Sequence, residues 1–152
     1  MTTQILEVFG QHLMMEGYGC SEDKLQDINL IYDCLDKLPE IVDMTKIIPP
    51  YVFKYSGKVP EDWGLTGFVL IAESHISIHT FPDKGFLTLD IFSCKQFDPD
   101  IAVNEIIELF EVKKYAVEIK DRGLEFPRSI PVVKEHLIGE RNSMKGDEYA
   151  SL

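Results

Sequence analysis

The chain has 152 residues, 45% of them hydrophobic, and a formal net charge of −11 at pH 7. This length suits a single domain with a substantial core, and because an acidic surface repels phosphate backbones we expect no nucleic-acid partner. The three cysteines lack the spacing of a disulfide framework or a zinc site, and no apolar run approaches the ~20 residues of a membrane span. The N-terminal residues also lack a signal-peptide pattern, so we expect a cytoplasmic protein with no metal and no membrane partner.

The first half of the chain predicts extended and helical segments in turn. Residues 6–16 predict a strand that ends at a glycine-rich turn, and residues 21–23 predict a second turn. Apolar residues then recur at helical spacing from Asp27 to Pro39, which predicts a helix that stops at the proline. The next predicted elements are strands at residues 44–48 and 51–55 and a loop at residues 56–64.

Three β-like segments follow in close succession, at residues 67–72, 75–81 and 86–94. A turn at residues 82–85 joins the last two as a hairpin. Asp98 and Pro99 predict the start of a helix, because Asp caps free N–H groups and proline suits the first helical position. Residues 115–119 predict a last strand, and the tail after Gly123 is expected to be partly disordered.

Strands outnumber helices in this reading, and the hairpins are short. The pattern predicts an α+β fold, a two-layer sandwich in which an antiparallel β-sheet has helices packed on one face. We expect a single domain over residues 1–125 and a C-terminal extension over residues 126–152.

The segment over residues 72–82 is the most informative part of the chain. Side chains alternate along a strand, so His75, Ser77 and His79 share one face and the isoleucines between them point to the other. An exposed polar strand face explains this pattern without any function. Cys94, at the end of the next strand, is equally explained as a small buried hydrophobe.

The sequence contains no zinc motif, phosphate loop, dinucleotide fingerprint or Gly-x-Ser-x-Gly elbow, so an enzyme here needs an electrophile made from its own chain. At residues 73–80, Pro82 and residues 90–94 the sequence resembles the S-adenosylmethionine decarboxylase proenzyme family, in its short bacterial and archaeal form. A weaker match lies at His12 and residues 18–20. The similarity spans residues 10–123.

The resemblance implies that the chain cleaves itself between Glu73 and Ser74. In this family the serine hydroxyl attacks the preceding carbonyl, which implies that Ser74 forms an ester with Glu73. His79 resembles the base that removes the Cα proton of Ser74, and Thr66 stands where a hydroxyl residue assists processing. β-Elimination and hydrolysis then convert Ser74 into a pyruvoyl group, the covalent cofactor.

A pyruvoyl ketone forms a Schiff base with the substrate amine and withdraws electrons, which no ordinary side chain does. Cys94 resembles the acid that protonates the product. The resemblance implies a β chain of residues 1–73 and an α chain of residues 74–152. It also implies that such αβ units form a dimer.

Asp83, Trp63 and Tyr55 are the candidate substrate-binding residues. Asp83 stands where the family usually has a Glu that pairs with the ribose hydroxyls. The family often has a Phe before Thr66 that stacks on adenine, but counting back from Ser74 places Pro60 there. Trp63 or Tyr55 is then the candidate platform for adenine and the sulfonium, and packing of Trp63 under the loop is the alternative.

We therefore expect a self-processing, pyruvoyl-dependent decarboxylase of the small molecule S-adenosylmethionine, which makes the aminopropyl donor for spermidine biosynthesis. The departures at Asp83 and in the loop over residues 55–64 keep open a decarboxylase of ornithine or arginine. A non-catalytic homologue is the third hypothesis. Against it stands the joint presence of four residues that the chemistry needs, Glu73, Ser74, His79 and Cys94.

Overall fold

The computed structural model describes residues 8–123 and 138–139. Residues 10–120 form one compact unit, and the described residues on either side of it belong to a second unit. The extension predicted for residues 126–152 falls outside the described residues, apart from residues 138 and 139.

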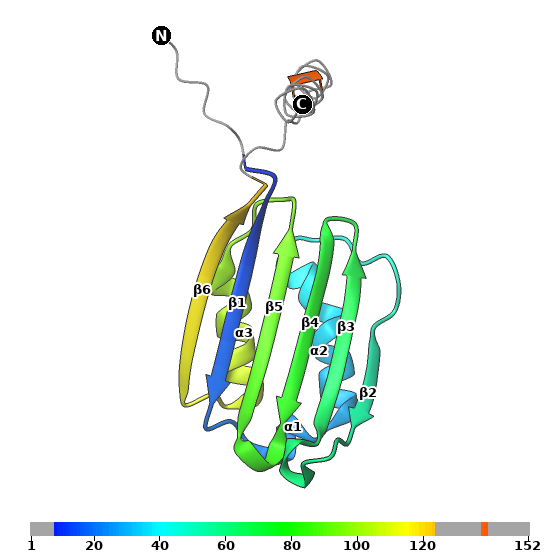
Figure 1. Ribbon diagram of the computed structural model, residues 1–152, viewed down its shortest axis with the longest axis vertical. Helices are drawn as coiled ribbons and strands as arrows, with labels where there is room; N and C mark the ends of the chain where they lie inside the picture. Colours follow the sequence, from blue (N-terminus) through cyan, green and yellow to red (C-terminus); the bar gives the residue numbers. More distant parts are fainter. Residues whose placement is uncertain (1–7, 124–137, 140–152) are drawn as a thin grey trace, which may run out of the picture. The chain divides into compact units, whose positions relative to one another are not determined.

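Six strands form a single sheet in the order β2-β3-β4-β5-β1-β6 (Figure 1). Their bounds are β1 (Gly10–Tyr18), β2 (Tyr51–Tyr55), β3 (Gly64–Ile71), β4 (Ser74–Phe81), β5 (Phe86–Ser93) and β6 (Lys114–Arg122). The pairings β2–β3, β3–β4, β4–β5 and β5–β1 are all antiparallel. β4 therefore lies between the two strands to which short hairpin connections join it.

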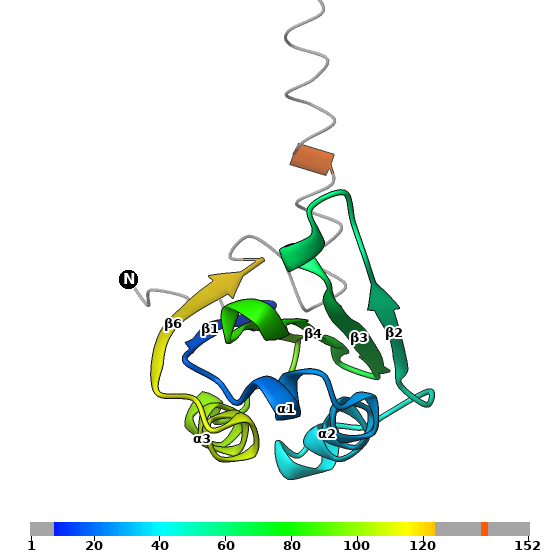
Figure 2. The same ribbon diagram turned by 90° about the horizontal axis from the view of Figure 1, so that it is seen from below.

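Three helices cover one face of this sheet, as Figure 2 shows. They are α1 (Glu22–Leu25), α2 (Ile28–Ile41) and α3 (Pro99–Phe110). Two 3₁₀ turns, η1 (Pro60–Asp62) and η2 (Pro82–Lys84), lie in the connections before β3 and before β5. The arrangement confirms the predicted two-layer α+β fold. In the part of the chain that the structure describes, no helix is both long and apolar enough to cross a bilayer.

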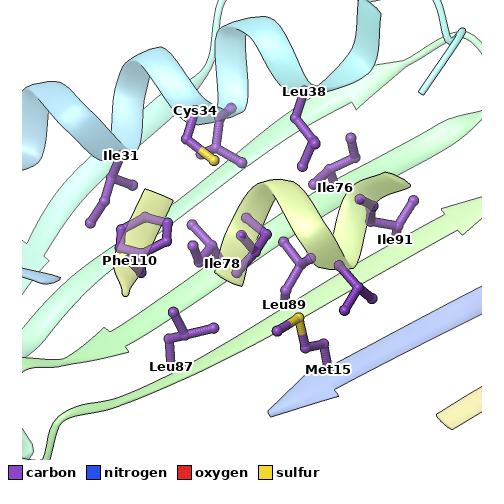
Figure 3. Close-up of a cluster of buried hydrophobic side chains, with 14 of the residues drawn as sticks. Met15, Ile31, Cys34, Leu38, Ile76, Ile78, Leu87, Leu89, Ile91 and Phe110 are labelled. Atoms are coloured by element: carbon purple, nitrogen blue, oxygen red, sulfur yellow. The ribbon is translucent and has the colours of Figure 1, made fainter. Parts of the chain in front are cut away.

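The core fills the space between the helices and the sheet (Figure 3). Ile76 and Ile78 of β4 are fully buried there, whereas His79 is exposed on the other face, so the predicted alternation along β4 is correct. Ile31 of α2 and Phe110 of α3 meet the sheet from the helix side and are also fully buried. Each such side chain contributes about 1.5–3 kcal/mol of burial free energy, so the register of β4 is firmly fixed.

Both long helices begin at a capping aspartate. Asp27 Oδ1 accepts hydrogen bonds from the backbone N–H groups of Asn29 and Leu30, at 3.0 and 3.1 Å. Asp98 Oδ1 accepts from Asp100 N at 3.0 Å, and Pro99 is the first helical residue, as predicted. A cap of this kind is typically worth about 1 kcal/mol.

One predicted helix end and two predicted element types are wrong. α2 continues through the buried Pro39 to Ile41. A proline in the last turn removes only one N–H donor, and only two helical residues follow it. Residues 21–23 predicted a turn, but α1 begins at Glu22. Residues 44–48 are not a strand: they make an isolated bridge between Lys46 and Ile71 and brace the end of β3.

Other strand limits differ from the predictions by a few residues. The first strand was predicted over residues 6–16 and is observed as Gly10–Tyr18, with residues 6 and 7 outside the described residues. β3 begins at Gly64, inside the predicted loop, because the chain passes close to β4 there. A Cβ at Gly64 would lie 1.6 Å from the Thr80 carbonyl oxygen, a contact that only glycine avoids.

Thr80 ties the sheet to the helix layer beside His79. Its buried hydroxyl donates to the Leu25 carbonyl of α1 at 2.8 Å and accepts from the Leu65 N–H of β3 at 3.1 Å. Thr80 thereby fixes the end of β4 that carries His79 and the facing residues of β3.

Replacing Thr80 with Val keeps the shape of the side chain but leaves the Leu65 N–H and the Leu25 carbonyl without their hydroxyl partner. We expect Thr80→Val to lower the free energy of unfolding by about 1–3 kcal/mol, measured by urea denaturation. Thr88→Val, on the helix-free face of β5, is the matched control and should change it by less than about 0.5 kcal/mol.

Both variants are best compared in the Ser74→Ala background, so that the self-cleavage expected from the sequence does not enter the comparison. Equal stabilities of the Thr80→Val and Thr88→Val proteins would contradict the anchoring role of Thr80.

Candidate active site

The predicted cleavage site lies in the turn between β3 and β4. Ile71 pairs with Ser74 across a two-residue turn formed by Ala72 and Glu73. The carbonyl oxygen of Glu73 accepts a hydrogen bond from the Cys94 backbone N–H at 3.0 Å. The Glu73 carboxylate accepts another from Thr45 N at 3.1 Å. Glu73 is therefore held both through its backbone carbonyl and through its side chain.

Ser74 has an unusual backbone conformation, with φ of +155°. Non-glycine residues rarely adopt such an angle, and residues held in sparsely populated regions cost of order 1–3 kcal/mol each. The Ser74 Oγ atom lies 3.0 Å from Nδ1 of His75, within hydrogen-bonding distance. The strain therefore sits on the residue whose hydroxyl the sequence predicts to react.

Cys94 follows β5 directly, and Ser74 pairs with Ser93 across the β4–β5 ladder. Cys94 is half-buried, whereas Cys20 and Cys34 are buried. Burial raises the pKa of the Cys20 thiol to about 11 and that of the Cys34 thiol to about 12, which keeps both protonated and inert at neutral pH. Of the three cysteines, Cys94 alone lies beside the cleavage site.

His79 lies at the opposite end of β4 from Ser74. Thr66 pairs with His79 across β3 and β4, and Thr66 Oγ1 lies 3.2 Å from His79 Nδ1. His79 is five residue steps along the extended strand from Ser74, which corresponds to roughly 16 Å. The structure thus brings Glu73, Ser74 and Cys94 together at one end and Thr66 and His79 together at the other.

A hollow of about 180 Å³ surrounds the Thr66–His79 pair. Tyr55 lines it, as do Asp62 and Phe81. Phe81 lies two residues after His79 on the same strand face, and the alternation could have revealed it, but the sequence reasoning did not assign it a role. An aromatic side chain from β2 and another from β4 thus flank this end.

The other two substrate-binding candidates lie apart from the walls of that hollow. Trp63 is half-buried, and Lys54 Nζ lies 4.8 Å from the centroid of its ring. Asp83 is exposed on η2, next to Lys84, which forms an ion pair with Asp62 of η1. The ion pair raises the pKa of the Lys84 ammonium and ties the two 3₁₀ turns together.

The face of the sheet opposite the helices is rich in apolar side chains. Leu70, Tyr51, Phe53 and Tyr55 remain 40–57% exposed on it. Phe68 stacks on Tyr51, and Phe86 stacks on Phe81. Within residues 8–123, the helices lie on the other face, so this apolar surface has no second layer.

Metal-ligating side chains do not gather in this region. Within the described ranges, no group of three or more His, Cys, Asp or Glu side chains could hold a metal ion. His12 instead pairs with Asp90, at 2.9 Å between Nε2 and Oδ1, on the helix-free face.

Known proteins match the chain over most of its length. The model of the S-adenosylmethionine decarboxylase family matches residues 11–123. The S-adenosylmethionine decarboxylase proenzyme of Pyrococcus furiosus is 35% identical over 121 residues, which cover 79% of this chain and 83% of that protein. The proenzyme of Clostridium botulinum strain Hall is 38% identical over 113 residues, 74% of this chain and 90% of that protein.

The fold agrees with these sequence matches. The crystal structure of the adenosylmethionine decarboxylase from Aquifex aeolicus superposes with a TM-score of 0.62 at 32% identity, covering 76% of this chain and 92% of that one. The identities, the coverage and the common fold lead to one conclusion: the chain belongs to the S-adenosylmethionine decarboxylase family.

Proposed function

We propose that this chain is a self-cleaving decarboxylase of S-adenosylmethionine that makes its own pyruvoyl group from Ser74 and supplies the aminopropyl donor for spermidine biosynthesis. The observation that carries this proposal is the state of the Glu73–Ser74 peptide. Its carbonyl accepts the Cys94 N–H, and its serine is held at a strained φ. Family membership supports the same reaction.

Cleavage begins with attack of Ser74 Oγ on the carbonyl carbon of Glu73. Negative charge then develops on the Glu73 oxygen, where the Cys94 N–H already points. A preorganised donor at such an oxygen is worth far more in the transition state than in the ground state. The Glu73–Ser74 C–N bond breaks, the nitrogen takes a proton, and an ester replaces the amide. Relief of the unusual Ser74 backbone favours the same step.

The ester is then resolved by elimination. His79 removes the Cα proton of Ser74, the electrons form a Cα=Cβ double bond, and Glu73 departs as a carboxylate. Hydrolysis of the resulting dehydroalanine releases ammonia and leaves the pyruvoyl group. Thr66 holds His79 Nδ1 at 3.2 Å, which leaves Nε2 to act as the base.

The pyruvoyl group, once formed, supplies a carbonyl that binds the substrate amine and accepts electrons as CO₂ leaves. Cys94, half-buried beside position 74, keeps the proton that the product Cα receives. Tyr55 and Phe81, at the His79 end of β4, offer aromatic faces for adenine and the sulfonium. Asp83, exposed on η2 outside that hollow, offers a carboxylate for the ribose hydroxyls. Trp63 is the weaker candidate platform because Lys54 already covers its ring.

The ornithine and arginine alternatives lose ground on this site. Their substrates are aliphatic and bear no adenine, whereas the hollow around His79 has aromatic walls. The relatives named above are all adenosylmethionine decarboxylases or proenzymes of that enzyme. A non-catalytic homologue would gain nothing from strain at Ser74.

We further propose that the working enzyme is a dimer of αβ units whose sites are shared between subunits. Proton transfer requires contact at about 3 Å, but the ordered strand β4 holds His79 roughly 16 Å from Ser74 of the same chain. A two-fold axis across the middle of β4, with the helix-free faces packed together, would bring the partner subunit's His79 over Ser74.

The surface chemistry supports this face as the interface. Exposed apolar patches beyond a few hundred Å² are rare on monomers and typical of association sites. Leu70, Tyr51 and Phe53 lie on this face with 40–56% of their surface accessible, and a second copy would bury them. The interface would also exclude water from the reacting groups.

Two substitutions separate cleavage from turnover. Ser74→Ala removes the nucleophile, so we expect a single uncleaved chain and no CO₂ release from S-adenosylmethionine. Cys94→Ala keeps the backbone N–H that contacts Glu73, so cleavage should proceed at nearly the normal rate while turnover falls by about 10²-fold or more.

Denaturing gels and trapping of released CO₂ measure the two effects, and Cys20→Ala is the matched cysteine control. Normal turnover by Cys94→Ala would remove its thiol from the mechanism. Exclusive turnover of ornithine or arginine would overturn the substrate assignment.

Mixing two inactive chains tests the shared site. Neither Ser74→Ala nor His79→Ala should cleave alone, but a heterodimer of the two contains one intact pair, Ser74 of one chain and His79 of the other. We expect the His79→Ala chain to be cleaved in the mixture after unfolding and refolding together, as measured by mass spectrometry. Failure to cleave, although light scattering shows heterodimers, would contradict the shared site.

A further inference from the structure

The proposed cleavage transfers two different protons. The first leaves Ser74 Oγ as the ester forms, and the second leaves Ser74 Cα during elimination. We propose that His75 is the catalytic residue that accepts the first proton, whereas His79 accepts only the second. This inference rests on the proposed self-cleavage and adds a residue to it.

The contact between Ser74 and His75 already joins the reacting atom to a base. Oγ and Nδ1 are 3.0 Å apart, and in the tautomer with its proton on Nε2, His75 accepts from the serine hydroxyl. General bases act at this distance. In a regular strand, consecutive side chains point to opposite faces, so neighbours do not meet. The φ of +155° breaks the pleat at Ser74 and accompanies a hydroxyl turned toward the next residue.

The imidazole of His75 is held in place by its neighbours across the sheet. Phe92 pairs with His75 in the β4–β5 ladder, and the two ring centroids are 6.1 Å apart with planes tilted by 57°. Phe92 in turn contacts the ring of His12, at 5.9 Å between centroids. His12 is fixed by its bond to Asp90. The contacts through Phe92 and His12 to Asp90 therefore keep the His75 ring in a fixed orientation toward the Ser74 hydroxyl.

The position of His79 argues for a division of labour. His79 of the same chain is roughly five residues of strand away from Ser74 and is engaged by Thr66. His75 needs no second subunit, because it belongs to the same chain and already touches the hydroxyl. The geometry therefore points to ester formation within one chain, followed by elimination that waits for the partner subunit.

The proposed step conserves protons and electrons. The Oγ–H proton passes to His75 Nδ1 while the Oγ–C bond to Glu73 forms. When the C–N bond breaks, the same proton passes from Nδ1 to the departing nitrogen of Ser74. His75 returns to its neutral state, and an amide and a hydroxyl have become an ester and an amine.

The test uses the full-length His79→Ala chain, in which the ester should form and persist. Hydroxylamine cleaves such an ester and releases a fragment that starts with an intact Ser74, identified by its mass. We expect the additional substitution His75→Asn to slow formation of this ester by about 10²- to 10⁴-fold. Asn places a hydrogen-bond acceptor near the hydroxyl but is not a base. If His75 only positioned the hydroxyl, the His75→Asn substitution would leave the rate of ester formation almost unchanged.

Ser77→Ala, on the same face of β4 and two residues further along, is the matched control and should leave the rate of ester formation unchanged. Urea unfolding of each chain confirms that it is folded. In a folded His75→Ala chain, added imidazole should restore ester formation in proportion to its concentration, because a free base can enter the space that the ring leaves.

Ester formation at the parental rate in His75→Asn would overturn the inference, as would a folded His75→Ala chain that ignores imidazole. Those results would leave the proposed function standing, because the wild-type chain would still cleave. Absence of cleavage in the wild-type chain would instead remove the proposed function itself.

Discussion

The hydrogen bond from the Cys94 N–H to the Glu73 carbonyl oxygen is the constraint on which the candidate site depends. It joins the turn between β3 and β4 to the end of β5, and so it places the Glu73 carbonyl, Ser74 and a half-buried thiol within one small region. The bond is possible because β4 is the strand between β3 and β5 and its register is fixed by Ile76 and Ile78. Core packing therefore aligns the groups that the proposed cleavage uses.

The same rigidity that assembles one half of the site separates the other half. An extended strand cannot fold back on itself, so Thr66 and His79 stay at the far end of β4 from Ser74. The proposed elimination needs both ends, and for this reason we propose that a second copy meets the first in the opposite direction. The apolar face without helices, which would be unfavourable on a monomer, is the surface that this proposal assigns to the contact.

Much of the fold could be predicted from the sequence, because local patterns decided it. The alternation of β4 and the Asp98–Pro99 start of α3 follow from side-chain direction and capping chemistry, and both are confirmed. The predicted turn at residues 82–85 also fixes the register of the β4–β5 hairpin, in which Ser74 pairs with Ser93. The φ of Ser74 and the cation over Trp63 could not be predicted, because they depend on how loops return to the sheet. The distance from Ser74 to His79 was implicit in the strand and was missed.

The proposed function depends on a break in the backbone ahead of Ser74, and the intact mass of freshly folded wild-type protein shows whether this break occurs. We expect two fragments, residues 1–73 and 74–152, whose masses sum to that of the precursor plus one water minus one ammonia. The second fragment should also gain the mass of a hydrazone when treated with a hydrazine. A full-length chain that persists unchanged and does not react with the hydrazine would contradict the account.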